Sequence, residues 1–459
     1  MSDELHSGLL YGLEQRIPPL PAFFSALQHV LAGLVGIITP PLIIGATLGL
    51  GDWLPYLISM SLLASGIGTF LQSNRVWGIG AGMICMQGTS FAFLGVTVAG
   101  GMWVKAQGGG PQDMMAMLFG VNFVAALVPV IVSRFIEPLK KIFTPIITGS
   151  VIALIGISLI KVSVINWCGG EKAEDFASMS NIALGAGTLG VIVLLSCAKN
   201  RWLRLSSVVV GIAVGCIAAG LSGQFHLHSL GDTLFRLPTL FPFGFQFNSA
   251  IFLPVALVSL VCILEAVGDL TANSLISQQS VDDRAFRNRL KGGILADGVS
   301  CMVAAMLCAF PNTTFAQNNG VIQMTGVASR YVGRYIGVIL ILLGLFPPVG
   351  ELLRQIPAPV LGGATMVMFG CVVAAGIRII TQTPLSRRDV LIVGLAFGAG
   401  LGVESVPAFL SHFPPIVGDL FGSAATSGGL VAIALNLILP QEQAATKSLR
   451  SQDDRAESV

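Results

Sequence analysis

Apolar runs recur along the whole chain, each close to the roughly 20 residues that an α-helix needs to cross a bilayer. Because no water is available inside a bilayer, the backbone N–H and C=O groups there have to be paired within the protein. Only 10% of the residues are charged and 54% are hydrophobic, whereas soluble domains carry about 25% charged residues. The sequence therefore predicts an all-α polytopic membrane protein.

Fourteen membrane segments are predicted from these runs. Two of them, around Phe91 and Gly320, are short and interrupted. With both termini in the cytoplasm, most of the 25 Lys and Arg residues fall in cytoplasmic loops, as the positive-inside rule requires. A miscounted segment would reverse the side of every later loop, so this bias supports the count. The segments centre on Val30, Ser61, Phe91, Ala125, Ala153, Val191, Ile212, Ser259, Val303, Gly320, Ile341, Phe369, Leu395 and Ala432.

The net charge and the cysteines exclude other classes. A net charge of +2 is too small to indicate a nucleic-acid partner. The eight cysteines form no CxxC pair, and most lie in or beside apolar segments. We therefore interpret them as packing residues and expect no disulfide framework, no metal site and no cofactor.

Two pairs of similar motifs indicate an internal duplication. Thr89-Ser90-Phe91-Ala92 closely matches Thr313-Thr314-Phe315-Ala316, and a proline with glycines four and eleven residues later also occurs twice. Short Thr, Phe and Ala strings recur by chance in apolar sequence. The two pairs stand at similar offsets of about seven segments, however, which would invert the second half in the membrane. The proline–glycine motifs are Pro145, Gly149, Gly156 and Pro359, Gly363, Gly370.

The two interruptions are typical of a secondary transporter. In inverted-repeat transporters, broken helices in matching positions flank a substrate site near the bilayer midplane. Non-helical backbone at that depth is tolerated only where it is buried in protein or lines a cavity. We therefore expect short extended breaks in segments three and ten that face each other across a binding site.

Four ionisable residues lie within the predicted segments, where such groups are expensive and usually functional. Glu265 and Asp269 are four residues apart in segment eight and therefore share a helix face. Asp297 lies in segment nine and His29 in segment one. For each of them the alternative is a structural group that a neighbouring helix satisfies.

The polar groups suit a small, planar, neutral ligand whose edge alternates N–H and C=O. Glu265 offers acceptors, Gln317 offers an acceptor and donors, and Phe91 offers a flat face. Nucleobases fit this set, whereas a buried glutamate would repel an inorganic anion. Several buried acids near a histidine also suit proton coupling, because burial and like charge favour a protonated carboxyl.

The stretch Gln317–Gly326 resembles the signature of the nucleobase–ascorbate transporters, also called the nucleobase:cation symporter-2 family. That signature reads Q/E/P, N, any residue, G, four residues of any kind, T, then R/K/G, and QNNGVIQMTG fits it at every position. LEAVGDLTA, RLKGGILADG and FAQNNGVIQMTGVASRYVGR look most like the bacterial xanthine permease branch. The similarity runs from about Leu13 to Pro440.

The resemblance implies fourteen spans in two inverted repeats of seven, in the inner (plasma) membrane of a bacterium, with both termini cytoplasmic. Segments one to four and eight to eleven would form a core domain that holds the substrate. The other six would form a gate domain that also makes a homodimer. The expected boundaries are 1–21 for the N-terminus, 22–140 and 249–350 for the core, 141–248 and 351–440 for the gate, and 441–459 for the cytoplasmic tail.

The resemblance also implies roles for single residues. Glu265 and Gln317 match the family's two purine-binding side chains. Phe91 matches the aromatic residue at the first break, and Asn318 the motif asparagine that supports the site. The residues tied to proton coupling or site organisation are Asp297, His29 and Asp269, and those expected to affect selectivity are Ser90, Thr325 and Gly326.

Ser90 departs from the xanthine permease pattern compared most closely, which has Asn at this position. A second bacterial group has Ser within a similar QGTSF string. Because that second group also consists of xanthine permeases, xanthine comes first among the expected substrates. The smaller residue leaves room at this position, so uric acid, guanine and hypoxanthine stay as alternatives.

The sequence thus predicts a proton-coupled importer of purine nucleobases whose partners are the purine, H⁺, membrane lipid and a second copy of the chain. No HExxH, GxSxG or Asp-rich metal motif is visible in the sequence, so an enzyme is not expected. The alternative function from another class of protein is that of an anion transporter or channel with the same seven-plus-seven architecture. It would carry a cationic or neutral residue in place of Glu265. A receptor that binds a nucleobase without moving it would look the same.

Overall fold

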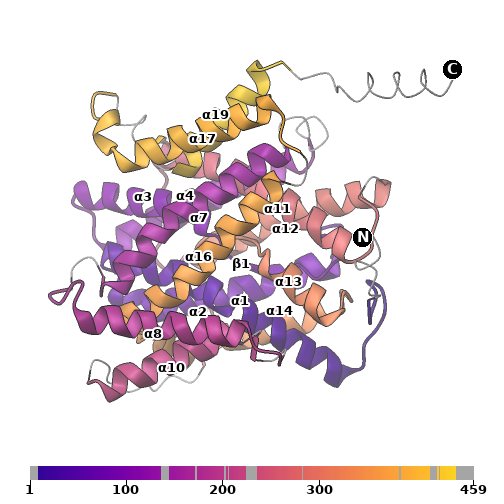
Figure 1. Cartoon of the computed structure of the whole chain (residues 1–459), viewed down its shortest axis with the longest axis horizontal. Coiled ribbons are helices and arrows are strands. Elements are labelled where there is room, and N and C mark those ends of the chain that lie inside the picture. The colour runs from indigo at the N-terminus through magenta and orange to yellow at the C-terminus, as the bar shows by residue number, and fades with distance from the viewer. Residues whose placement is uncertain are drawn as a thin grey trace, which may run out of the picture.

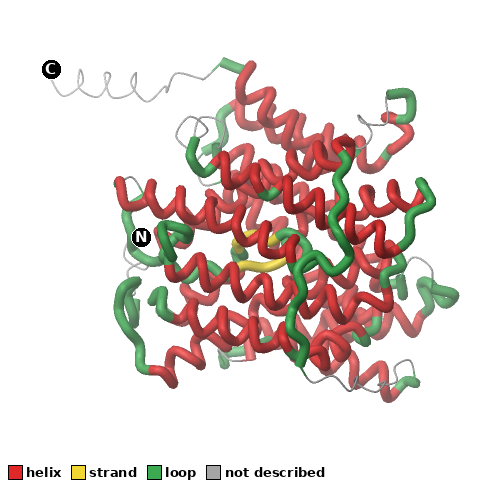
Figure 2. Tube along the Cα trace, turned by 180° about the vertical axis from the view of Figure 1, so that it is seen from behind, coloured by secondary structure: helices red, strands yellow, loops and turns green. Residues whose placement is uncertain are grey.

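The structure is a computed structural model that describes residues 9–135, 144–170, 173–200, 203–204, 206–223, 235–281, 283–381, 384–413, 421–422 and 424–440. The predicted tail 441–459 lies outside the described residues, as do 1–8 of the predicted N-terminus and 141–143 and 224–234 of the predicted gate. Helices make up nearly all of the regular structure, and one pair of short strands lies at its centre (Figure 2).

The described helices form two groups, and each group packs mainly among its own members. The first group consists of α1 (Pro19–Leu48), α2 (Leu54–Asn74), α3 (Leu94–Ala106), α4 (Pro111–Ala125), α5 (Leu127–Val132), α11 (Ser249–Ile276), α12 (Arg284–Met306), α13 (Gln317–Thr325), α14 (Val332–Leu345) and α15 (Pro347–Arg354). The second consists of α7 (Pro145–Trp167), α8 (Met179–Ser196), α10 (Ser207–Leu221), α16 (Ala358–Ile380), α17 (Arg387–Ser405) and α19 (Ala424–Ile438).

Seven of the described helices are long and apolar enough to cross a membrane, or eight if α14 and α15 form one span. These two helices meet at an angle of 78°. Phe346 between them is extended because Pro347 follows it, and a residue before proline avoids the helical region. Each predicted segment centre lies in a helical element. The protein is therefore a mostly helical multi-pass membrane protein, while the count of fourteen spans stays a prediction.

Both stretches expected to be interrupted contain a short strand followed by a helix. β1 (Gln87–Thr89) pairs antiparallel with β2 (Asn312–Thr314), with Gly88 opposite Thr313. One further backbone hydrogen bond continues the pairing at each end. Ser90 N donates to Pro311 O at 2.8 Å, and Phe315 N donates to Met86 O at 3.0 Å. Residues far apart in the sequence thus meet at the centre of the first helix group (Figures 1 and 2).

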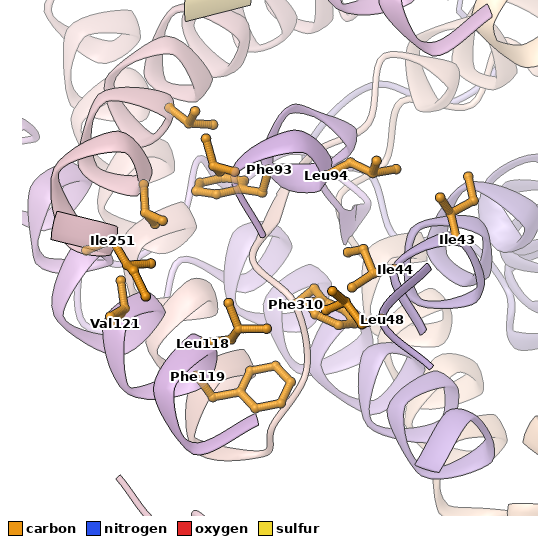
Figure 3. Packing of buried hydrophobic residues seen from close by; sticks show 14 of the residues in the cluster. Ile43, Ile44, Leu48, Phe93, Leu94, Leu118, Phe119, Val121, Ile251 and Phe310 are labelled. Carbon is orange, nitrogen blue, oxygen red and sulfur yellow. The ribbon is translucent and has the colours of Figure 1, made fainter. Parts of the chain in front are cut away.

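The strand pair is held between close-packed apolar side chains. A Cβ at Gly88 would overlap the ring of Phe315, so only glycine allows the ring to lie against β1. Before β2, Phe310 packs on Phe119 of α4 with ring centroids 5.4 Å apart. Both rings are fully buried, in a cluster that also receives Phe93 from the short 3-10 helix η2 (Phe91–Phe93) (Figure 3). The packing fixes both breaks relative to α4.

The second helix group is built around α7 and α16, which lie along each other (Figure 1). Each helix has 23 residues, and each begins at the proline of the repeated proline–glycine motif. A Cβ on Gly149 would stand 2.7 Å from Gly376 O, and one on Gly156 would stand 2.7 Å from Val373 N. The motif glycines of α7 therefore permit close backbone contact with α16, whereas Gly370 faces open space.

Candidate functional site

The two breaks and the middle of α11 surround one region of the first helix group. α11 packs against η2, β2 and α13, so it touches both of the stretches that contain a short strand. Ser90 is extended, with φ −74° and ψ 126°, immediately before η2. Gln317 begins α13 two residues after Phe315, which is still bonded to the backbone of Met86. Polar side chains from three non-consecutive segments are thereby brought together.

Glu265 and Gln317 have no protein partner among the described residues. Both side chains are partly exposed, and neither makes a hydrogen bond to any residue that the structure describes. A carboxylate and an amide at this depth are costly to leave unpaired. Their donors and acceptors are therefore available to a ligand.

Asn318 connects the two interrupted stretches through a hydrogen bond. Its Nδ2 donates to Ile84 O in the stretch before β1, and Asn273 of α11 donates to the same carbonyl at 2.7 Å. His29 of α1 lies beside Asn318. The two ring nitrogens of His29 and the Asn318 Oδ1 are buried without a hydrogen-bond partner among the described residues. Asn318 thus joins α13 to the stretch before β1, and the His29 ring lies beside the Asn318 amide.

Asp297 is bonded to two glutamines that the sequence did not single out as site residues. Its Oδ1 accepts from Gln72 Nε2 at 2.8 Å and from Gln87 Nε2 at 2.7 Å. Gln72 also donates to Gly293 O and accepts from Ala81 N, so its orientation is fixed. Both glutamines lie in the second and third predicted membrane segments. A polar amide at that depth was the sequence signal that could have identified them as site residues.

Three acids share this part of the bundle. Glu265 lies near enough to Asp297 for their charges to interact, and Asp269 lies near both. Asp269 is buried, its Oδ2 has no hydrogen-bond partner in the described chain, and its backbone carbonyl accepts from Asn319 at 3.3 Å. None of the three forms an ion pair with a described residue. Uncompensated charge on all three together would be very unfavourable.

Ser90 and Phe91 meet two residues that sequence reasoning missed. Ser90 Oγ lies 3.5 Å from Cys262 Sγ of α11, and the hydroxyl does not cap η2. The Phe91 ring packs edge to face on Phe369 of α16, with centroids 5.1 Å apart. Phe369 belongs to the other helix group, so no local pattern in the sequence could have paired it with Phe91.

Thr325 and Gly326 lie at the far end of α13. The Thr325 hydroxyl donates to Val321 O at 2.8 Å and accepts from Val327 N at 3.1 Å, and Gly326 ends the helix with φ 67°. The helix separates them from Gln317 by about 12 Å. Gly326 O instead accepts from Leu10 N at 2.8 Å, which joins the N-terminal segment to this end. The structure does not bring these two residues to the ligand-facing groups.

The sequence matches a known family of membrane proteins. The model of the Permease family matches residues 21–409, most of the length that contains both breaks. The chain belongs to the Permease family. This permease is accordingly a transporter and not an enzyme.

Individual relatives are similar over nearly the full length. The permease is 42% identical over 446 residues to the xanthine permease XanP of Escherichia coli (strain K12), covering 95% of this chain and 96% of that protein. It is 43% identical over 448 residues to the xanthine permease XanQ of the same strain, covering 96% of each. The uric acid permease PucJ of Bacillus subtilis (strain 168) is 33% identical, covering 90% of this chain and 92% of that protein.

Solved structures show the same fold at low sequence identity. The permease resembles the transmembrane domain of the cyanobacterial bicarbonate transporter BicA with a TM-score of 0.56 and 14% identity, covering 93% of this chain and 99% of that one. It resembles the murine anion transporter Slc26a9 in its inward-facing state with a TM-score of 0.60 and 12% identity, covering 92% and 69%. At such identities the likeness concerns the fold alone.

Proposed function

We propose that this permease imports purine nucleobases, with xanthine as its main substrate, by symport with protons. The observation that carries the proposal is the pair Glu265 and Gln317, two side chains beside the breaks that no described residue satisfies. Xanthine permeases that match nearly the whole chain at 42–43% identity support the choice of purine.

The pair matches the edge of a xanthine molecule. A carboxylate accepts two N–H groups, and an amide both donates to a carbonyl and accepts from an N–H. Xanthine alternates such groups around its ring, so Glu265 and Gln317 can each satisfy one part of the edge. The Phe91 ring would stack on the flat face once Phe369 has withdrawn.

Proton coupling is supported by the crowding of Glu265, Asp269 and Asp297. Three neighbouring acids without an ion-pair partner, two of them buried, are least costly when at least one is protonated. Gln72 and Gln87 both donate to Asp297, which stabilises its ionised form, so that Asp297 can release a proton during the transport cycle. Substrate and H⁺ would therefore enter together.

Architecture and location complete the proposal. The chain would have fourteen spans in two inverted sevens, with α1–α5 and α11–α15 as the core and with α7, α8, α10, α16, α17 and α19 in the gate. The gate would form a homodimer in the bacterial inner membrane, surrounded by lipid, with both termini cytoplasmic. The division of the described helices into two packing groups supports this assignment.

Two alternatives remain open to test. Uric acid as the main substrate is supported by the 33% identity with a uric acid permease and by the small side chain of Ser90. Anion transport is supported only by a shared fold at 12–14% identity, and Glu265 opposes it.

Uptake measurements test the proposal. Cells without their own permeases would express this chain and receive labelled xanthine, uric acid, guanine, hypoxanthine or uracil, with and without a protonophore. We expect xanthine uptake that the protonophore abolishes and that a Na⁺ gradient does not drive. Uptake that follows Na⁺ and ignores the protonophore would overturn the coupling, and bicarbonate uptake without xanthine uptake would overturn the substrate class.

A further inference from the structure

A small cavity lies beside the strand pair, between α4, α5, α11, α12 and β2. Its polar lining comes from Asn122, Ser259, Asp297, Asn312 and Thr313. Of the described residues that line it, none is Glu265 or Gln317. It nevertheless includes Asp297, one of the three acids of the site.

Three of the lining side chains are almost completely buried and have an unpaired polar atom. Asn122 is 4% exposed, Asn312 2% and Thr313 3%. Asn122 Nδ2, Asn312 Oδ1 and Thr313 Oγ1 have no hydrogen-bond partner among the described residues. The orientation of the Asn312 amide is set by its Nδ2, which donates to Ser300 Oγ at 3.2 Å. The residues that line the cavity therefore include one unpaired donor, one unpaired acceptor and one unpaired hydroxyl.

The size of the cavity limits what it can hold. The space open to the centre of a water molecule is about 20 Å³, and one buried water needs about 10–15 Å³ by the same measure. A purine is far larger than this space. A water can accept from the Asn122 amide and donate to the other two unpaired atoms, as buried waters usually do.

We propose that this cavity holds one bound water, which pairs the three buried atoms and gives Asp297 access to protons during transport. The proton role rests on the proposed symport. When Asp297 releases a proton, the water oxygen accepts it and passes another proton to the next water that reaches the cavity, so the bound water is restored. The Asp297 carboxylate keeps the donors Gln72 and Gln87 throughout.

Several other ionisable groups lie close enough to Asp297 to interact with its charge. No cation of the described chain is paired with it. The groups that interact with it electrostatically are Glu265, Asp269 and Cys262 of α11, Cys301 of α12, and Cys85 before β1.

Two transport modes separate the proton step from substrate binding. Purified protein in proteoliposomes would be assayed for net xanthine uptake driven by a pH gradient and for xanthine exchange at equal pH. Asn122→Leu removes the donor and fills the space. We expect net uptake to fall by about 100-fold, the lower end of what a positioned proton-transfer group contributes, while exchange stays close to the wild-type rate. Thr313→Val should give the same split if Asn122→Leu does not fold.

Asn166→Leu is the matched control. Asn166 also has a buried unpaired Nδ2, but it lies on α7 and does not line the cavity. Both modes should survive in this variant. Loss of both modes, or of neither, in folded Asn122→Leu and Thr313→Val would overturn the proton role.

A high-resolution cryo-EM map tests the water itself. We expect density for one water within hydrogen-bond distance of Asn122, Asn312 and Thr313. An empty cavity, or density that appears only with Na⁺, overturns the inference. Failure of the symport proposal is seen separately, because wild-type uptake would then ignore the protonophore.

Discussion

Phe91 at the first break and Phe369 in the middle of α16 stand edge to face, with ring planes at 86° and centroids 5.1 Å apart. The contact joins the two helix groups directly at the proposed purine site. A pair of this geometry contributes about 0.5–1.5 kcal/mol beyond the area it buries. A purine that stacks on Phe91 competes with this contact, so substrate binding and separation of the two groups are linked.

Replacing the second ring should therefore strengthen binding. Phe369→Leu keeps an apolar side chain but removes the competing ring, and we expect xanthine affinity to rise by about 2- to 10-fold. Calorimetry on purified protein would measure it. Phe245→Leu is the control, because Phe245 packs edge to face on Phe241 before α11, with ring centroids 5.7 Å apart. The xanthine affinity of this variant should not change. Weaker binding by Phe369→Leu would mean that Phe369 contacts the substrate.

The polar contacts predict a loss of affinity in two isosteric variants. Gln317→Glu removes the amide donors, and Glu265→Gln removes the charged acceptor. Each leaves a purine group unpaired, at a cost of about 1–3 kcal/mol, or roughly 5- to 150-fold in Kd. Wild-type affinity for xanthine in both purified variants would remove these residues from the site.

The contact between Ser90 and Cys262 predicts an effect on selectivity. Asn in place of Ser90 has to fill the space next to the Cys262 thiol and the adjoining ligand space. We expect Ser90→Asn to narrow the substrate range towards xanthine and Ser90→Ala to widen it or leave it unchanged. Competition of labelled xanthine uptake by uric acid, 8-methylxanthine and hypoxanthine would measure this. The same inhibition pattern in all three proteins contradicts a role in reading the imidazole side.

The bonds of Gln72 predict a loss of stability. Gln72→Leu removes a donor to the Asp297 carboxylate and leaves Gly293 O and Ala81 N without this partner. A hydrogen bond to a charged group contributes about 1.5–3 kcal/mol, so the melting temperature in detergent and the uptake rate should both fall. The exposed Gln107→Leu serves as the control. An unchanged melting temperature for Gln72→Leu would show that Asp297 does not need this donor.

The glycine in β1 predicts a steric effect that a second substitution can relieve. Gly88→Ala places a methyl group in the ring of Phe315, and overpacking of this kind costs about 1–3 kcal/mol. Gly88→Ala combined with Phe315→Leu should recover part of the melting temperature. Gly370→Ala, which meets open space in a helix, should be neutral or stabilising by about 1 kcal/mol. No rescue by the double variant would contradict the close packing.

Local sequence patterns were sufficient for the membrane class and the family signature, and they singled out the two stretches that contain the short strands. A helix that crosses a bilayer needs a continuous apolar run, and a break in it leaves a polar, Thr-rich stretch, so both features are visible over short windows. The repeated Thr-x-Phe-Ala strings likewise indicated which two stretches correspond. In the structure these two stretches pair with each other, with Gly88 opposite Thr313.

Only the tertiary structure decided the partners of the polar groups. Gln72 and Gln87 on Asp297, Cys262 beside Ser90, and Phe369 on Phe91 each join segments that are far apart in the chain. Such contacts depend on the rotation and spacing of packed helices, which a single sequence does not encode locally. The sequence determined that Glu265 and Gln317 are polar groups at membrane depth, and the packing around α11 decided that they, unlike Asp297, are left without a protein partner.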